Sequence, residues 1–130
     1  SLSDLFCVER HKPHFLDLVK NKLDITFANE QEIMSLIDAK NFRDVIDFGK
    51  NLKKLLIVTR GDKGAISING DEVVENGVEK NLSIKDLTGA GDLFASGFLH
   101  GNINNLSSIE CLDKGRQMSS KVIQQIGARL

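Results

Sequence analysis

The stretch DLTGAGDLFASGFLHG, from Asp86 to Gly101, joins a glycine-rich turn to the start of an apolar helix. Gly89, Ala90 and Gly91 form the turn, and the acid Asp92 follows it directly. Glycine loses more conformational entropy on folding than other residues, so the glycines of this turn indicate that its backbone must stay free of side chains. A helix N-terminus leaves N–H groups unpaired and carries a partial positive charge. The turn is therefore predicted to bind an anion such as phosphate.

Asp92 is the most informative residue of this stretch. A carboxylate beside a phosphate site is repelled by its ligand, which makes sense if the acid accepts a proton from an attacking hydroxyl, as kinases require. A structural alternative stays open, because glycines permit tight packing and the helix dipole favours an acid in the first turn. The spacing matches neither the Walker A loop nor the dinucleotide GxGxxG pattern.

A second glycine-containing stretch, VTRGDKGA, covers residues 58–65. It follows the apolar run LLIVT, Leu55 to Thr59, whose composition suits a strand that is covered on both faces. Ligands of open α/β sheets bind at the carboxyl ends of strands, so Gly61 and Gly64 are candidate ligand contacts and the Thr59 hydroxyl is a candidate phosphate contact. The alternative is a plain glycine turn that leads into a hairpin.

A third stretch, NEQE, runs from Asn29 to Glu32 after the strand-like run LDITFAN. Asn29 as helix N-cap and Glu32 three residues later form a capping arrangement. In the functional alternative, Glu32 holds water bound to Mg²⁺, a contact that carboxylates commonly make with this ion.

The remaining elements follow from hydrophobic periodicity and turn signals. Asn69-Gly70 is a strong signal for a two-residue hairpin, and Ser107 with Glu110 is predicted to cap the last helix, for which Gly127 is a plausible stop. The opening SLSDLFCVERHKP reads as a loop. The order predicts α/β layering with a parallel sheet and one antiparallel excursion. The other predicted elements are helices from Pro13 to about Lys22, after Asn29, after Asn41 and after the glycine turn, and strands at 23–29, 55–59 and 81–87.

Composition narrows the function classes. The 130 residues suit one domain, and 41% hydrophobic and 27% charged residues are ordinary for a water-soluble fold. A net charge of −1 gives no indication of a nucleic-acid partner. No apolar run approaches the roughly 20 residues of a membrane span, so we expect no membrane partner. Two distant cysteines, Cys7 and Cys111, are typical of a reduced, cytoplasmic setting.

Together and in this order, the three stretches resemble the ribokinase/PfkB family of sugar and nucleoside kinases. DLTGAGD is similar to that family's DTxGAGD signature, with Leu87 at a position that varies. The stretch at 29–32 is similar to its N-x-x-E element, and the one at 58–65 to its T-x-G-x-x-G element. The tail SKVIQQIGARL resembles the family's last core helix. The opening SLSDLFCVERH and the tail's IGAR lean towards the adenosine-kinase-like bacterial branch.

The resemblance implies an ATP-dependent kinase with a ribokinase-like three-layer α/β/α fold and a mostly parallel sheet. Asp92 would be the catalytic base that deprotonates the acceptor hydroxyl. The N–H groups of Gly89, Ala90 and Gly91 would form the anion hole for charge that develops on the γ-phosphoryl group.

The resemblance also implies a set of cofactor contacts. Asn29 and Glu32 would help to place Mg²⁺ and phosphate. Asp86, with the backbone near Gly127 and Ala128, is the candidate for a monovalent cation such as K⁺. The residues that would line the nucleotide are Thr59, Gly61 and Gly64 on the phosphate and ribose side and Ser119 and Val122 at the adenine.

Full members of that family are longer, so the resemblance implies that residues 1–130 are a carboxyl-terminal part that holds the ATP site and the base. The amino-terminal half, with the substrate motif and the lid, would be absent. Two other hypotheses stay open. One is a nucleotide-binding module without catalysis of its own, and the other is a truncated product that forms homo-oligomers through surface left by the missing half.

Overall fold

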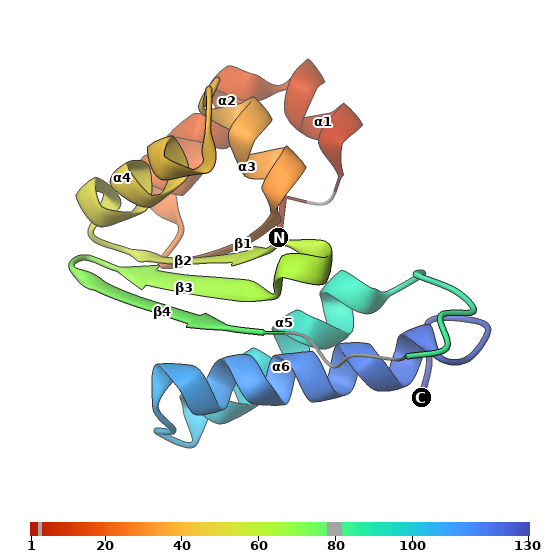
Figure 1. Cartoon of the computed structure of the whole chain (residues 1–130). Helices are drawn as coiled ribbons and strands as arrows, with labels where there is room; N and C mark the ends of the chain where they lie inside the picture. Colours follow the sequence, from red (N-terminus) through yellow and green to blue (C-terminus); the bar gives the residue numbers. More distant parts are fainter. Residues whose placement is uncertain (3, 78–81) are drawn as a thin grey trace. The chain divides into compact units, whose positions relative to one another are not determined.

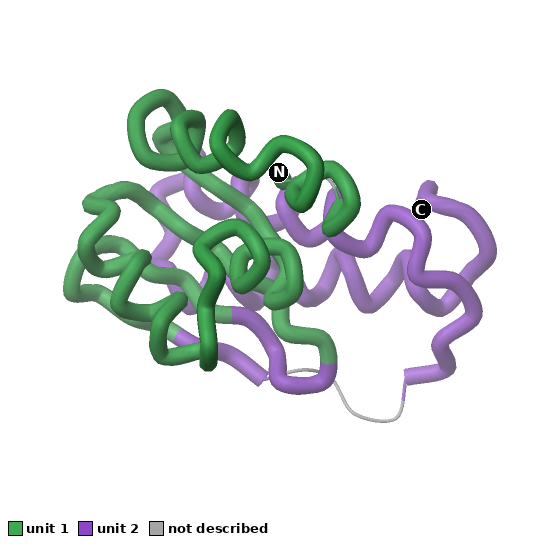
Figure 2. The backbone as a smooth tube through the Cα atoms, turned by 90° about the horizontal axis from the view of Figure 1, so that it is seen from above, with its two compact units in different colours: residues 1–61, 66–74 green, residues 62–65, 75–130 purple. Residues whose placement is uncertain are grey.

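The computed structural model describes residues 1–2, 4–77 and 82–130. The chain divides into two compact units, shown in green and purple in Figure 2. Unit 1 comprises Ser1–Gly61 and Ile66–Val74, and unit 2 comprises Asp62–Ala65 and Glu75–Leu130. Each unit has its own packing, and the candidate site residues are divided between them.

Unit 1 is an α/β layer in which helices cover one face of two parallel strands (Figure 1). The helix predicted from Pro13 to about Lys22 is present, but it changes to a π-helix in its last turn. The elements of unit 1 up to the second strand are α1 (Leu5–Arg10), α2 (Lys12–Asp17), η1 (Leu18–Lys22), β1 (Ile25–Asn29), α3 (Glu30–Leu36), α4 (Phe42–Leu52) and β2 (Leu55–Thr59).

The two parallel strands have a register that aligns their carboxyl ends. Ile25 lies opposite Leu55, and Asn29 lies opposite Thr59. The middle of β2 is fully buried, as the continuous apolar run predicts. Two predicted motif positions therefore lie side by side at the same edge of the sheet.

A hairpin completes the sheet, whose strand order is β1-β2-β3-β4. Strands β3 (Ala65–Asn69) and β4 (Glu72–Asn76) are joined by Gly70 and Asp71, and Gly70 has a φ of +60°. The predicted hairpin is thus confirmed, with its two-residue loop at Gly70 and Asp71 instead of Asn69 and Gly70, because Asn69 ends β3. The link from β2 to β3 holds only the short 3-10 helix η2 (Gly61–Lys63), which is too short for a parallel crossover. The sheet is mixed, and the predicted α/β class is confirmed.

The core of unit 1 lies between the helices and the strands. Gly49 of α4 passes so close to the sheet that a Cβ there would lie 2.8 Å from Ile68 Cγ2. Residues that bury their side chains in this core include Leu2, Val8, Val19, Ile33, Leu36, Val45, Leu56, Val58, Ile66 and Ile68.

Unit 2 is built on two long helices, α5 (Ala90–Ile103) and α6 (Ser108–Ile123), both at predicted positions. Glycines let them approach closely, since a Cβ at Gly97 would lie 2.5 Å from the Lys114 carbonyl oxygen. The Ser107 hydroxyl caps α6 by accepting the Glu110 N–H over 3.4 Å.

Three sequence predictions need correction. The opening segment is not a loop throughout, because Asp4 Oδ1 accepts the Cys7 N–H over 2.8 Å and caps α1. Residues 82–87 form no strand: the N–H groups of Lys85 and Asp86 donate to the Ile123 carbonyl at the end of α6. Asn81, the first residue of that predicted strand, lies outside the described residues.

The third correction concerns the end of α6. The helix ends at Ile123, where Gln124 is the C-cap, so Gly127 is not its stop. Gly127 has a left-handed φ of +95°, and its N–H donates to Asp86 Oδ2 over 2.9 Å. In the part of the chain that the structure describes, none of the helices has the length and apolar character needed to cross a bilayer.

Candidate functional site

The edge of the sheet in unit 1 brings two predicted contacts together. Asn29 ends β1 and Thr59 ends β2, and they are register partners. Asn29 is exposed and Thr59 is half-buried. Because both strands are parallel, this edge is the carboxyl edge at which α/β sheets bind ligands.

The predicted capping arrangement at the start of α3 is complete. Asn29 Oδ1 accepts the Glu32 N–H over 2.8 Å, and Glu32 Oε2 accepts the Asn29 N–H over 2.9 Å. Glu32 is 5% exposed, and this burial raises the pKa of its carboxyl group above the ordinary value. Capping thus accounts for both residues structurally, and their role toward Mg²⁺ stays a prediction.

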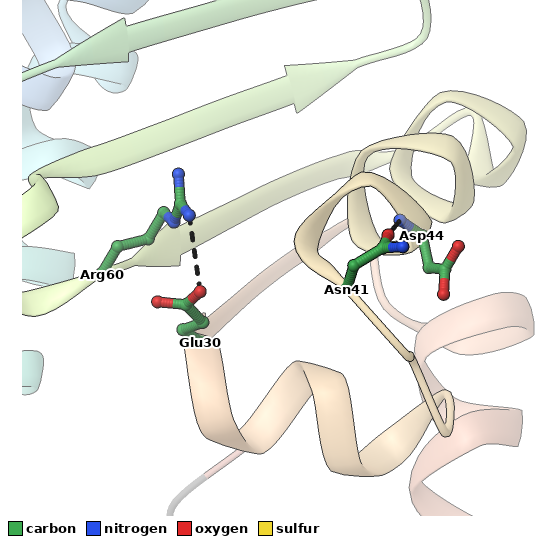
Figure 3. Close-up of polar contacts among 4 residues, drawn as sticks. All are labelled: Glu30, Asn41, Asp44 and Arg60. Atoms are coloured by element: carbon green, nitrogen blue, oxygen red, sulfur yellow. Dashed lines mark hydrogen bonds and ion pairs between the residues drawn. The ribbon is translucent and has the colours of Figure 1, made fainter.

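Sequence reasoning missed Arg60, which stands between two predicted phosphate contacts, Thr59 and Gly61. Its Nη2 lies 3.4 Å from Glu30 Oε1 (Figure 3), and its guanidinium carbon lies 3.5 Å from the ring centroid of Phe42. A basic residue inside the glycine stretch was the available signal, but its partners are 30 and 18 positions away in the sequence.

In unit 2, Asp86 organises the segment that precedes the glycine turn. Its Oδ1 accepts the Thr88 hydroxyl over 2.7 Å and the Thr88 N–H over 2.9 Å, and Oδ2 accepts the Gly127 N–H. These donors, the Thr88 hydroxyl above all, lower the pKa of Asp86 to about 2. The carboxylate therefore joins the turn to the segment after α6.

The structure explains the two glycines of the predicted turn, Gly89 and Gly91, in different ways. Gly89 is the N-cap of α5 with a left-handed φ of +79°, and a Cβ there would lie 2.7 Å from Ala128 Cβ. Gly91 lies inside the helix, and a Cβ there would meet no atom within 4 Å. Conformation and packing explain Gly89, whereas open space surrounds the missing side chain of Gly91.

The N-terminus of α5 has two N–H groups left for an anion. The Ala90 N–H donates to the Leu87 carbonyl over 3.2 Å, whereas within residues 82–130 those of Gly91 and Asp92 have no acceptor. Unpaired N–H groups are general at the first turn of a helix. Asp92 itself is exposed. The turn thus combines free backbone donors with a carboxylate open to solvent.

The two glycines of the stretch VTRGDKGA also differ in how much space surrounds them. Gly64 has a φ of +90°, and a Cβ there would lie 1.9 Å from the carbonyl oxygen of Asn76. The backbone of Asn76 thus leaves no room for a side chain at Gly64. This agrees with the alternative in which the stretch is a plain glycine turn that leads into a hairpin. Gly61 has a φ of +58° and open space around it.

The predicted adenine contacts lie on the last turns of α6. Ser119 is partly exposed, and Val122 is fully buried. The Ile123 carbonyl, next to Val122, accepts the N–H groups of Lys85 and Asp86. This end of α6 is thereby joined to the segment that leads into the glycine turn.

The carboxylates differ in how well they suit a metal ion. Among the described residues, no group of three or more His, Cys, Asp or Glu side chains is arranged to hold one. Mg²⁺ commonly uses only one or two carboxylates, with water and substrate phosphates as further ligands. Glu32 at the carboxyl edge is buried and accepts one hydrogen bond, from the Asn29 N–H, whereas the Asp86 oxygens already accept three hydrogen bonds from the chain.

The site residues thus form two groups. Unit 1 brings together Asn29, Glu32, Thr59 and Arg60 at the carboxyl edge of the parallel strands. Unit 2 holds the glycine turn with Asp92, and Asp86 with its donors. These elements define the class of the protein. It is an α/β protein with a mixed sheet and a glycine turn before a helix.

The chain belongs to the pfkB family of carbohydrate kinases, which it matches over residues 6–130. It is 38% identical to the adenosine kinase from Sinorhizobium meliloti, with a TM-score of 0.94 over 99% of this chain and 40% of that one. It is 26% identical to the Arabidopsis thaliana ribokinase complexed with ribose and ATP, with a TM-score of 0.75 over 86% of this chain and 38% of that one. The ribokinase-like fold is confirmed.

A match to a curated relative supports the same family assignment. The chain is 30% identical to the cytidine kinase of Thermococcus kodakarensis over 111 residues, which are 84% of this chain and 40% of the relative. The chain therefore spans less than half the length of the kinases that it matches. These relatives are sugar and nucleoside kinases, which agrees with the resemblance of its three motifs.

Proposed function

We propose that this chain carries the nucleotide-binding and catalytic-base part of an ATP-dependent kinase that phosphorylates a hydroxyl group of a sugar or nucleoside. The observation that carries the proposal is the start of α5, where the unpaired N–H groups of Gly91 and Asp92 lie beside the Asp92 carboxylate. Its membership of the pfkB family supports phosphoryl transfer as the chemistry. We expect the reaction to take place in the cytoplasm.

In this proposal the chain's residues position and activate the reactants. Asp92 accepts the proton of the acceptor hydroxyl as the oxygen attacks. The N–H groups of Gly91 and Asp92 stabilise negative charge on the transferred group. They lie next to Gly89 and Ala90 of the predicted anion hole, but the Ala90 N–H donates to the Leu87 carbonyl. ATP, when bound, would supply the γ-phosphoryl group, and ADP would leave as the bond between the γ-phosphorus and the β,γ-bridging oxygen breaks. Because the N–H groups are fixed by the helix, they need no reorganisation during the reaction.

The remaining predicted contacts belong to nucleotide and cation. Glu32 and Asn29, at the carboxyl edge of β1, would help to place Mg²⁺ and phosphate. Thr59, Gly61 and Gly64 contact the phosphate and ribose side, and Ser119 and Val122 contact the adenine. A monovalent cation such as K⁺ at Asp86 would have to share the carboxylate with Thr88 and Gly127.

The test of the proposal is Asp92→Asn in a full-length kinase that contains this chain. We expect phosphoryl transfer to be lost while Mg·ATP affinity stays near that of the unmodified enzyme, because the asparagine keeps the shape but cannot accept the proton. Asp47→Asn, an exposed acid on α4, is the matched control and should leave turnover unchanged. Near-normal turnover of the Asp92 variant would exclude its role as base.

A truncated product that forms homo-oligomers is the second candidate. Large apolar side chains of unit 2 are strongly exposed, among them Ile84 at 62%, Leu87 at 67% and Ile126 at 85%. Exposed apolar patches favour association. Calorimetric titration of the 130-residue chain with Mg·ATP, with its mass measured in solution, tests this candidate, because no binding together with an oligomeric mass would favour it. Measurable turnover of a sugar or nucleoside by this chain alone would exclude the non-catalytic module.

A further inference from the structure

Arg60 joins three segments of unit 1. Glu30, its ion-pair partner at 3.4 Å, is the first residue of α3, and Phe42, under its guanidinium at 3.5 Å, is the first residue of α4. The side chains of Arg60 and Glu30 are only 18% and 27% exposed. Figure 3 shows Arg60 directed from the end of β2 toward Glu30. One side chain thus contacts the starts of two helices.

This arrangement is not explained by stability alone. The Nε of Arg60 is buried and has no hydrogen-bond partner among the described residues. A buried polar atom without a partner costs stability and needs an explanation. An apolar side chain of similar volume would cover Phe42 without that cost. The cost of the unpaired Nε therefore indicates a role other than stability, and the geometry that the guanidinium fixes is a candidate for it.

The position of the ion pair indicates what is fixed. Arg60 lies between Thr59 and Gly61, the proposed phosphate contacts, and Glu30 lies between Asn29 and Glu32, the proposed Mg²⁺ contacts. We propose that Arg60 is a positioning residue, which sets the spacing between these two segments so that one Mg·ATP can bind both. The inference rests on the proposed function. In this role Arg60 acts through its contacts with Glu30 and Phe42.

The experiment is titration of the 130-residue chain with Mg·ATP, comparing the unmodified chain with Arg60→Ala, Arg60→Lys and Glu30→Gln. We expect Arg60→Ala to weaken binding about tenfold, the equivalent of one charge-assisted contact. Arg60→Lys should recover part of the loss, because an ammonium group can pair with Glu30 but lacks the planar fork. Lys12→Ala, which removes the 2.6 Å ion pair with Asp38 in the same unit, is the control and should bind normally.

A second measurement separates positioning from general stability. Amide hydrogen exchange should become faster at residues 29–33 and at 59–61 in Arg60→Ala, and stay unchanged in Lys12→Ala. If the unmodified chain binds Mg·ATP and all Arg60 and Glu30 variants bind equally well, the positioning role is overturned and the proposed function stands. If the unmodified chain fails to bind Mg·ATP, the proposed function fails and the inference with it. Should Arg60→Ala fail to fold, Arg60→Lys and Glu30→Gln decide the question.

Discussion

Asp86 and Gly127 are 41 positions apart in the sequence, and the Gly127 N–H donates to Asp86 Oδ2 over 2.9 Å. Through Thr88, the same carboxylate also holds the segment that enters the glycine turn. The turn before α5 is therefore anchored to the tail after α6. An anchored turn keeps its N–H groups pre-organised for an anion, which is what the proposed reaction requires.

Asp86→Asn should lower the stability of the fold at neutral pH. The further loss of stability between about pH 4 and about pH 2 should be smaller in this variant than in the unmodified chain. The pKa of Asp86 is lowered from 3.8 to about 2 in the folded chain. Its contribution is therefore fully present above the unfolded pKa and is lost as pH falls from about 4 towards about 2. Melting temperatures of both proteins between pH 2 and pH 7 should converge at the acid end. Asp47→Asn is the control, and a constant difference across the range would contradict the role of Asp86.

The local signals in the sequence predicted most of the fold. The strand LLIVT, the hairpin near Asn69-Gly70, the cap at Asn29 and the helix after Asn41 depend on neighbours within a few residues, and the structure confirms each of them. The strand predicted at 81–87 failed in its described part because its backbone groups pair with the end of α6. That partner is distant in sequence, so no local pattern indicates it.

In the candidate site, too, features that depend on local sequence were predicted and features that depend on distant residues were not. The glycine turn and the acid after it were visible in the sequence because backbone conformation and helix dipole act locally. Arg60 was missed because its meaning depends on Glu30 and Phe42, which the fold brings to it. The separate reasons for Gly89 and Gly91 also needed the structure, since only packing shows that Ala128 lies against one of them.

Gly89→Ala and Gly91→Ala form a matched pair. Gly89→Ala should destabilise the chain by at least about 1–2 kcal/mol, because it forces a left-handed φ on alanine and places a methyl group against Ala128. Gly91→Ala should not destabilise, because the position is helical and open, and alanine favours a helix by up to about 1 kcal/mol. Its methyl group should nevertheless weaken Mg·ATP binding. Urea unfolding and calorimetric titration measure the two effects.

The outcome for Gly91 decides whether the open space is functional. Unchanged Mg·ATP affinity in Gly91→Ala, with the unmodified chain binding, would show that phosphate does not approach the backbone at this position. The open space would then be only a consequence of its location at the surface.

Gly64→Ala and Gly61→Ala should differ even more in stability. An alanine Cβ at Gly64 would lie 1.9 Å from the Asn76 carbonyl oxygen, so the end of β4 must move, at a cost of about 3 kcal/mol. Gly61→Ala has open space and should cost only the left-handed conformation, about 1 kcal/mol. Urea unfolding checks both values. Equal losses would mean that the backbone near Asn76 adjusts freely.

Glu32→Gln separates capping from metal binding. Glutamine keeps an oxygen for the Asn29 N–H and removes a buried charge, so the free energy of unfolding should change by less than about 1 kcal/mol. Loss of the carboxylate should make Mg·ATP binding require a higher Mg²⁺ concentration, while binding of ATP in the presence of a chelator stays unchanged. Titrations of both proteins over a series of Mg²⁺ concentrations measure this shift. If only the stability falls and the Mg²⁺ dependence is unaltered, Glu32 is a capping residue and the metal ligand must be sought elsewhere.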